Sequence, residues 1–516
     1  MNNTPWRDRL YAADLALDSS NSQLLLAVTN AAMRDFGNDP SALLDFGSRL
    51  LQAGLFDQAE KLLIASHQYE PYSVECTAKL AYIYLQTLRQ KRALSSYCLL
   101  SPSSSQMMAL AYQLDYNSNS VRVLAEEWAS QLPNIEQYKP IPSIEDSFAI
   151  GFLSADFCQH PVGLFLLPLV EELSSNHRIQ LFFYDLNPRH DWLSSKLRDC
   201  GHWLDVKLFS DHEIALKINS DNVSVLIDLS GHTAGNRLTV FRYRPSFVQL
   251  SWLGYWATNG FSSCCDGVLV DSLLAPPDSP EALSFVEPLF YLPLSRWCYK
   301  PVPWMPQVTN PPCLNNGFVT FGCFNSSPKL NDLLFETWAK LLHKVPDSRL
   351  YLKNYQFADR QFRALVSQKF LNLGISESRL VLEGPSVHAQ LLSSYKSVDI
   401  ALDTFPFNGG LTSCEALWLG LPIVSLLGED TSAVMASRQG MSLLMMLDKP
   451  EWCVNTIDEY IQVSANLASD YAYLKQIRFS QRAEMQSSSL CNSRQFADSF
   501  LDCIRNIYLF KKSRHL

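Results

Sequence analysis

The stretch Asp403–Pro422 reads DTFPFNGGLTSCEALWLGLP. It begins at the end of an apolar run, VDIALD, that is typical of a buried strand, and it continues into a pattern typical of a helix. Two consecutive glycines, Gly409 and Gly410, allow a ligand to approach the backbone closely between these elements. The first N–H groups of the helix and its dipole favour an anion there. The stretch therefore predicts a strand–loop–helix unit that binds a diphosphate, although Asn-Gly-Gly is also a common turn and Ser or Thr a common helix cap.

The same alternation of apolar and amphipathic runs recurs along most of the chain. The expected strands are FAIGFLSAD, IQLFFYDL, VSVLIDLS and VQLSWLG in one group, and FVTFGCFN, RLYLKN, RLVLEG, VDIALD and PIVSLLG in a second group. Strands that alternate with helices predict parallel sheets. The proline-rich residues 298–316 separate the two groups and predict a linker. We therefore expect two α/β domains, at 147–297 and 317–516, the second ending in a C-terminal helix, that face each other across a hinge.

Residues 1–137 have a helical pattern with an internal period of 34 residues. Three positions recur at this spacing: Gly47 with Ala81, Ala59 with Ala93, and Leu63 with Tyr97. This is the period of tetratricopeptide helix pairs, in which small residues allow two helices to approach. Such arrays bind extended peptides on a concave surface. We expect an all-α repeat domain that binds a peptide, with a generic helical bundle as the other interpretation.

The composition excludes several classes of protein. The chain has 516 residues, 42 basic and 51 acidic, and a formal net charge of -9, which argues against a surface that follows nucleic-acid phosphates. Its 13 cysteines include no C-x-x-C pair and predict neither a disulfide framework nor a zinc ribbon. No apolar run reaches the ~18 residues of a membrane span, and no signal pattern opens the chain. We expect a soluble, cytoplasmic protein without nucleic-acid or membrane partners.

Three spacings that would indicate other nucleotide sites are absent. The glycines form neither G-x-G nor G-x-x-x-x-G-K, so the dinucleotide fingerprint and the P-loop are missing. No two aspartates have the spacing D-x-D, which commonly holds a metal-bound sugar nucleotide. A transferase of phosphorylated donors built on this chain is therefore expected to work without a metal or another cofactor.

Four more motifs accompany NGGLTSCEALWLGLPIV in the chain. They are SADFCQHPVGLFLLPLVEE, DLSGHTAGNRLTVFRYRPSFVQLSWLGYWATNG, FGCFNSSPKLND and MASRQG. Together these motifs resemble the O-linked N-acetylglucosamine transferase family in its bacterial SPINDLY-like branch, over residues 148–510. The tetratricopeptide segment in front is also the arrangement of that family.

The resemblance implies a fold and an activity. The fold is GT-B, with two Rossmann-like α/β domains, and the C-terminal domain holds most of the nucleotide-sugar donor. The implied enzyme is an inverting, metal-independent glycosyltransferase that moves a single sugar to Ser or Thr hydroxyls of a protein bound through the repeats. A UDP-sugar is the expected donor, although GlcNAc, glucose and fucose all remain open within the family. Transfer to Asn or to a non-protein acceptor, and an inactive tetratricopeptide adaptor, are the alternatives.

The resemblance also implies the residues of the site. Lys329 matches the family's lysine beside the donor diphosphate, where its charge offsets the charge that develops as the nucleotide leaves. His160 matches a histidine before proline that serves as a general base or positions the acceptor. Apart from the resemblance, the position of Glu415 one turn into the helix predicts that it accepts a hydrogen bond from a ribose hydroxyl, with a helix-capping role as the other interpretation. The full donor-binding set is Gly254, Ser326, Asn408, Gly409, Gly410, Leu411, Thr412, Ser413 and Glu415, with His232 and Phe407 as further candidates to line the cleft.

The chain departs from the family's pattern at several positions. Animal members have a histidine and two threonines at positions 410–412, where this chain has Gly, Leu and Thr, and they have an aspartate in place of Glu415. Phe407 stands where a small cysteine lies beside the N-acetyl pocket. A ring that points into this pocket favours a donor without an acetyl group, such as UDP-glucose, whereas a ring that turns into the core leaves room for either sugar. A family histidine that helps to bind the nucleotide matches Leu391 and not the nearby His388.

Overall fold

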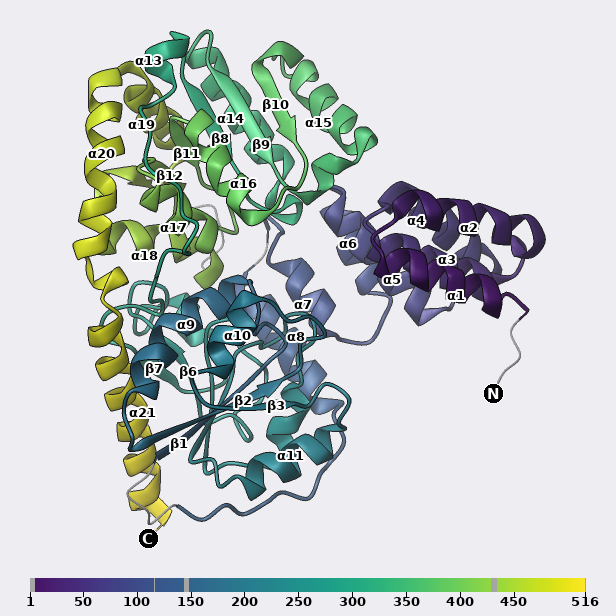
Figure 1. The fold of residues 1–516 in the computed structure, drawn as a ribbon, viewed down its shortest axis with the longest axis vertical. Helices are drawn as coiled ribbons and strands as arrows, with labels where there is room; N and C mark the ends of the chain where they lie inside the picture. Colours follow the sequence, from purple (N-terminus) through teal and green to yellow (C-terminus); the bar gives the residue numbers. More distant parts are fainter. Residues whose placement is uncertain (1–4, 116, 143–147, 428–433, 516) are drawn as a thin grey trace.

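The computed structural model describes residues 5–115, 117–142, 148–427 and 434–515. Figure 1 shows a helical array that projects to one side and two α/β units stacked along the long axis of the molecule. None of the helices in these described ranges combines the length and the apolarity that crossing a membrane requires.

The helical array consists of three helix pairs. They are α1 (Arg7–Asp18) with α2 (Ser22–Phe36), α3 (Pro40–Gln52) with α4 (Phe56–Tyr69), and α5 (Val74–Gln86) with α6 (Gln90–Tyr97). The 34-residue period relates the second pair to the third, and its small residues stand where helices are in close contact: a Cβ at Gly47 would lie 3.0 Å from Leu63 Cγ. Gly54 turns the second pair at φ +74°, and Leu88 turns the third at φ +63°. The third pair thus keeps the turn without the glycine, in a conformation that leucine rarely adopts.

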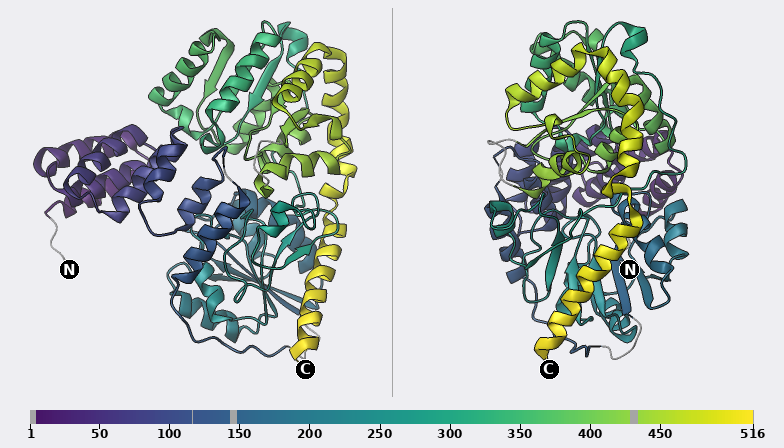
Figure 2. Two further views of the ribbon diagram at one scale, coloured as in Figure 1. Left: turned by 180° about the vertical axis from the view of Figure 1, so that it is seen from behind. Right: turned by 90° about the vertical axis from the view of Figure 1, so that its left-hand side faces the viewer.

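Two further helices, α7 (Ser104–Leu110) and α8 (Ser118–Ser130), leave this array and pack on the first α/β unit (Figure 2, left). The Trp128 ring stacks on Phe261 with ring centroids 5.7 Å apart. Ala111 and Val121 belong to the same buried core as the strands of that unit. The sequence predicts one helical domain over 1–137, whereas the structure divides these residues, because the α/β unit covers the apolar side chains of α7 and α8.

The first α/β unit contains seven parallel strands in the order β3-β2-β1-β4-β5-β6-β7. They are β1 (Phe148–Ser154), β2 (Ile179–Asp185), β3 (His202–Asp205), β4 (Val225–Asp228), β5 (Val248–Ser251), β6 (Gly267–Val270) and β7 (Leu289–Tyr291). The helices are α9 (Pro161–Ser174), α10 (Trp192–Arg198), α11 (Asp211–Ser220), η1 (Leu238–Tyr243) and α12 (Pro280–Leu283). The strand order reverses between β1 and β4, so their carboxyl ends open a crevice in which ligands usually bind.

The second α/β unit repeats this plan with six parallel strands in the order β10-β9-β8-β11-β12-β13. They are β8 (Thr320–Cys323), β9 (Arg349–Lys353), β10 (Leu380–Glu383), β11 (Ile400–Leu402), β12 (Ile423–Leu426) and β13 (Cys453–Val454). The helices from α13 (Cys313–Asn316) to α16 are η2 (Ser327–Lys329), α14 (Asp332–Lys344), η3 (Tyr355–Ala358), α15 (Arg360–Asn372), η4 (Glu377–Arg379) and α16 (His388–Ser394). After them come η5 (Tyr395–Ser397), α17 (Leu411–Trp418), η6 (Met435–Arg438), α18 (Gln439–Met446), η7 (Pro450–Trp452) and α19 (Ile457–Ser469). The order reverses between β8 and β11, and the chain leaves these two strands toward η2 and α17.

The last helices connect the two units. α20 (Tyr471–Ser487), η8 (Ser489–Cys491) and α21 (Ser493–His515) run along one side of the molecule (Figure 1). The rings of Phe500 and Trp252 pack with centroids 4.9 Å apart. The sequence predicts residues 317–516 as one domain, but α21 packs on the first unit, because its apolar face completes the core there.

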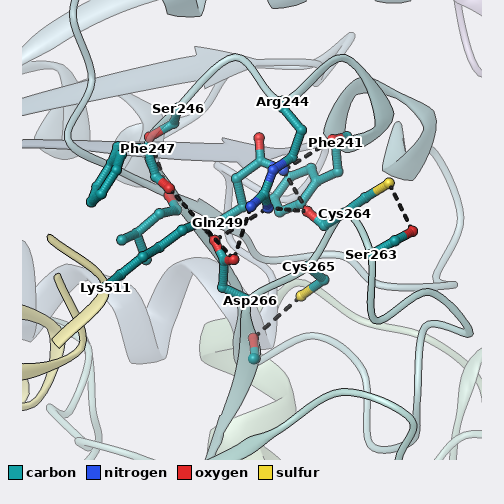
Figure 3. A network of polar contacts seen from close by, with 12 residues as sticks. Phe241, Arg244, Ser246, Phe247, Gln249, Ser263, Cys264, Cys265, Asp266 and Lys511 are labelled. Carbon is teal, nitrogen blue, oxygen red and sulfur yellow. Dashed lines mark hydrogen bonds and ion pairs between the residues drawn. The ribbon is translucent and has the colours of Figure 1, made fainter. Parts of the chain in front are cut away.

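A polar network holds the end of α21 in place (Figure 3). The Lys511 ammonium donates to the Phe247 carbonyl and to Asp266 Oδ1, both at 2.7 Å. The Asp266 carboxylate also accepts from the Arg244 guanidinium at 3.0 Å and from the Gln249 N–H at 2.8 Å. Because Arg244, Gln249 and Asp266 all belong to the first unit, this network anchors the C-terminal helix to it.

Candidate active site

A cleft of about 610 Å³ lies between the carboxyl ends of the two sheets. The predicted site residues among its lining are His160, Gly254, Ser326, Lys329, Phe407, Gly410, Leu411 and Thr412. They come from both α/β units and from strand ends far apart in the sequence. The structure therefore brings together most of the predicted set.

Asn408 and Gly409 build the loop after β11, and the Asn408 side chain and the Gly409 N–H bond to neighbouring parts of the protein. The Asn408 side chain donates to the Thr404 carbonyl (2.8 Å) and accepts from the Gly440 N–H (3.2 Å). The Gly409 N–H donates to Asp403 Oδ1 (2.7 Å), and a Cβ at Gly409 would lie 2.4 Å from an oxygen of the following helix. These two residues thus shape the loop, and the cleft begins at the residue that follows them.

The start of α17 faces the cleft. Gly410, Leu411 and Thr412 line it, whereas Ser413 is buried and its N–H donates to the Gly410 carbonyl (3.1 Å). The N–H groups of Leu411 and Thr412 belong to the first turn, where a helix leaves its donors without intrahelical partners. A ligand anion at this position would meet those donors and the positive end of the helix dipole.

Lys329 lies beside this helix start. Its ammonium donates to the Asn408 carbonyl (2.7 Å) and to Asn325 Oδ1 (3.3 Å). Burial lowers the pKa of Lys329 to about 8, against the opposing effect of the nearby Asp403 carboxylate. Burial in turn raises the pKa of Asp403 to about 6. At neutral pH the cleft therefore holds a positive charge next to the α17 donors.

The Phe407 ring lines the cleft where three parts of the chain meet. It stacks on Tyr112, which follows α7, with centroids 5.3 Å apart and an interplanar angle of 16°. It also packs against Trp256 of the first unit at 5.0 Å. The ring is thus held from two sides and keeps one part at the cleft surface.

His160 faces the cleft from the first unit. It caps α9, with Nδ1 accepting from the Val162 N–H (3.4 Å) and lying 3.5 Å from Asp156 Oδ1. The side chain is 42% exposed. Surrounding protein lowers the pKa of His160, against the opposing effect of Asp156, and burial raises the pKa of Asp156. At neutral pH the imidazole is therefore mostly neutral and can accept a proton.

Gly254 lines the cleft on the same side, and the reason for its glycine is local packing. A Cβ at this position would lie 2.0 Å from the Leu229 carbonyl oxygen. Any larger residue would push the β4 and β5 loops apart. Ser326 is exposed at the cleft, at the start of η2.

Two more predicted site residues, His232 and Glu415, lie outside the cleft in addition to Asn408, Gly409 and Ser413. His232 is 1% exposed, accepts at Nδ1 from the Ser104 hydroxyl (2.9 Å) and donates from Nε2 to the Asn259 carbonyl (3.1 Å). Burial lowers its pKa to about 4, so it is a neutral residue that attaches α7 to the first unit. Glu415 is buried, and its Oε1 lies 2.7 Å from His388 Nε2. Its carboxylate is therefore occupied by an internal partner instead of facing a ribose.

The contact between Glu415 and His388 also explains the position of His388. Its Nδ1 accepts from the Trp304 indole N–H (3.3 Å), so both ring nitrogens have protein partners. Leu391, one turn further along α16, lines the cleft instead. Leu391 and not His388 therefore reaches the cleft, and its role toward a nucleotide stays a prediction.

Several cleft residues are missing from the sequence-based set, among them Lys353, Asn354, Tyr355 and Gln439. Lys353 and Asn354 stand at the carboxyl end of β9, a position that the strand-end rule would have selected. The Lys353 side chain is 1% exposed and its ammonium pairs with Glu383. Gln439 belongs to the MASRQG motif, whereas no sequence signal marks Tyr355.

Comparison with known proteins agrees with this architecture. A model described as glycosyl transferase family 41 matches residues 131–298 and 309–500. The chain is 33% identical over 383 residues to a protein of Arabidopsis thaliana named "Probable UDP-N-acetylglucosamine--peptide N-acetylglucosaminyltransferase SPINDLY", covering 73% of this chain and 41% of the relative. The protein of the same name from Oryza sativa subsp. japonica is 33% identical over 374 residues, covering 71% and 40%. The chain thus spans about two fifths of the length of these relatives.

A solved structure is similar over nearly the whole chain. It is a mutant of the Thermobaculum terrenum O-GlcNAc transferase, with a TM-score of 0.88, 28% sequence identity, and coverage of 99% of this chain and 98% of that one. The predicted GT-B fold with a helical N-terminal region is confirmed by this similarity. On the family model and the SPINDLY relatives together, the chain belongs to glycosyltransferase family 41.

Proposed function

We propose that this protein is an inverting, metal-independent glycosyltransferase that moves a single sugar from a nucleotide sugar to Ser or Thr hydroxyls of a peptide. The observation that carries the proposal is the Lys329 ammonium, 2.7 Å from the Asn408 carbonyl, beside the start of α17 in a cleft between two doubly wound sheets. The names of the SPINDLY relatives specify UDP-N-acetylglucosamine and a peptide. A UDP-sugar is accordingly the donor class we propose.

The donor diphosphate would lie between Lys329 and the first N–H groups of α17. Leu411 and Thr412 supply backbone donors, and the Thr412 hydroxyl adds another. A bound diphosphate also raises the pKa of Lys329, because an adjacent opposite charge favours the ammonium. Binding and protonation of the lysine thus support each other, and the site supplies positive charge without a metal ion.

Transfer proceeds by displacement at the anomeric carbon. The acceptor oxygen forms a bond to this carbon on the face opposite the diphosphate, and the bond from the carbon to the β-phosphate oxygen breaks. The electron pair leaves with the nucleoside diphosphate, and the hydroxyl proton passes to a base. Lys329 stabilises the charge that develops on the leaving group. His160, neutral at physiological pH, is the group proposed to accept the proton or to orient the acceptor hydroxyl.

A panel of donors tests this proposal. The protein is incubated with UDP-GlcNAc, UDP-glucose or GDP-fucose and with acceptor peptides that contain Ser, Thr or Asn, and each product is measured by intact mass. We expect a single-sugar mass increment on a Ser or Thr peptide with one UDP-sugar, and its loss in Lys329→Met. A mass increment on the Asn peptide would show that the acceptor is asparagine and not Ser or Thr, and would overturn that part of the proposal. Calorimetry that detects binding of neither UDP nor GDP would instead support an inactive adaptor.

A further inference from the structure

We propose that the third helix pair, α5 and α6, is part of the donor site: it holds the turn η2, which carries Lys329, and Gln90 is its main positioning residue. The proposal rests on the sugar transfer proposed above. It gives the helical array a role beyond binding of a peptide acceptor, because the array would set the position of a charge at the reacting centre.

The contacts between this helix pair and η2 carry the argument. Gln90 is the first residue of α6, and its side-chain amide donates to the carbonyls of Leu330 (2.5 Å) and Pro328 (3.5 Å). These two residues flank Lys329 in the sequence. Gln90 therefore bonds to the backbone on both sides of the lysine.

The last residue of α5 makes a second attachment. The Gln86 carbonyl accepts from the hydroxyl of Ser327, which is fully buried (2.9 Å). Its side-chain oxygen accepts from the Gln356 amide of η3 (2.6 Å). One connection between two helices, at residues 86–90, thus bonds to the beginning and the end of η2 and to a neighbouring turn of the same unit.

The turn needs such external support because it is short. Within it, the Lys329 N–H donates to the Ser326 carbonyl (3.1 Å) and the Leu330 N–H to the Ser327 carbonyl (2.9 Å). A three-residue turn with two internal hydrogen bonds has little rigidity of its own. Its external hydrogen bonds therefore help to determine the position of the Lys329 backbone, from which the side chain extends. A displacement of about 1 Å at a reacting group can cost ~10²-fold in rate, even when the mutation lies far from the chemistry.

The helical region supports the other end of the lysine as well. The ammonium lies 4.3 Å from the centroid of the Phe407 ring, and that ring stacks on Tyr112. Residues of the helical region therefore contact both the backbone that carries Lys329 and the ring under its charge. An array that served only to bind acceptor would not require Gln90 and Gln86 to bond to this turn.

The test separates donor chemistry from acceptor binding. Donor hydrolysis without acceptor and transfer to peptide are measured for wild type, Gln90→Ala and Gln90→Glu. Glutamate keeps the shape of Gln90 but has no N–H to donate to two carbonyls, so both variants should lose activity. Lys91→Ala, at the next and exposed position of α6, is the matched control. Ser327→Ala removes the second attachment, the hydrogen bond to the Gln86 carbonyl, by a change in the turn η2 and not in the helix pair.

We expect kcat for hydrolysis and for transfer to fall together by about tenfold in both Gln90 variants, with the KM for the peptide unchanged. Because Gln90 and Ser327 hold the same turn, the loss in the double variant should differ from the product of the two single losses. Thermal unfolding shows which variants fold. If Gln90→Ala does not fold, the kcat of the nearly isosteric Gln90→Glu decides whether Gln90 positions the turn. Unchanged kcat in a folded Gln90 variant, or a change confined to the peptide KM, would overturn the inference. Wild type that turns over none of the donors would instead overturn the proposed function itself.

Discussion

The Lys329 ammonium lies over the face of the Phe407 ring, 4.3 Å from its centroid. A cation at this distance is attracted by the electrons of the ring, and the attraction increases when water is excluded. The ring thus favours the charged form of the lysine, while burial lowers its pKa to about 8. The result is a cation with little water around it, in contact with the cleft where a diphosphate would bind.

Replacement of Lys329 by methionine is expected to reduce kcat by ~10²–10³, because one preorganised electrostatic contact to the leaving group is lost. The fold should remain, since methionine fills a similar volume. Lys340→Met, on the exposed face of α14, is the control and should retain full activity. Turnover is measured with the best donor of the panel. Equal turnover in Lys329→Met and wild type would show that the diphosphate binds elsewhere.

The affinity for UDP is expected to fall as the pH rises from about 7 to about 9.5, because Lys329, with a pKa of about 8, loses its charge over this range. Bound diphosphate raises that pKa, so the basic limb of kcat should lie at higher pH than that of kcat/KM. Calorimetry across the range measures the affinity, and Lys329→Met should remove most of the dependence. A wild-type affinity that is constant over these pH values would contradict the assignment.

His160→Asn is expected to reduce turnover by ~10²–10⁴ where the imidazole is the base, and by less where it only orients the acceptor. Asparagine is chosen because it is also a good helix cap, so α9 should keep its start. The pKa of His160 is lowered, so the wild-type enzyme should lose kcat/KM only below the usual histidine range, and the variant should lack this acidic limb. Full activity in the folded variant would remove His160 from the site.

Phe407→Ala is expected to raise kcat/KM for UDP-GlcNAc relative to UDP-glucose, because the ring lines the cleft in which the donor sugar is proposed to bind. An apolar wall changes such a preference by only ~1–3 kcal/mol. The ring also supports Lys329, so both absolute rates should fall and the ratio is the informative quantity. Phe407→Tyr keeps the ring and should keep the ratio. A ratio that is the same in Phe407→Ala and wild type would show that the Phe407 ring does not select between the two donor sugars.

His232 is expected to reduce stability in acid. Its pKa is lowered from 6.5 to about 4 in the folded protein, so between these values the unfolded chain binds more protons. The free energy of unfolding should therefore fall as the pH drops from about 6.5 to about 4, by about 1–3 kcal/mol from this residue. Denaturant titrations of His232→Gln should show a shallower fall, whereas the exposed His177→Gln should match wild type. Equal slopes in all three proteins would contradict the prediction.

The elements that carry local patterns could be predicted from the sequence. Strands such as Ile400–Leu402 are short apolar runs, and the loop from Asp403 to Gly410 contains the turn residues that a strand-to-helix connection needs. The position of Lys329 next to a strand end likewise follows from its motif, and so does its place in the cleft. These predictions depend on residues close together in the chain, whose geometry is largely local.

The tertiary structure alone decided that some of the predicted side chains do not reach the cleft. Glu415 and His232 have suitable chemistry and suitable neighbours in the sequence, but His388 and Ser104, each more than twenty residues away, hold them inside the protein.

Only the folded chain also reveals that α21 returns to the first unit and that Gln90 contacts the turn of Lys329, 239 residues further along. The composition and period of a segment determine that it forms a helix with an apolar face. They do not determine which distant surface covers that face, because burial and hydrogen bonding depend on every element that packs against it.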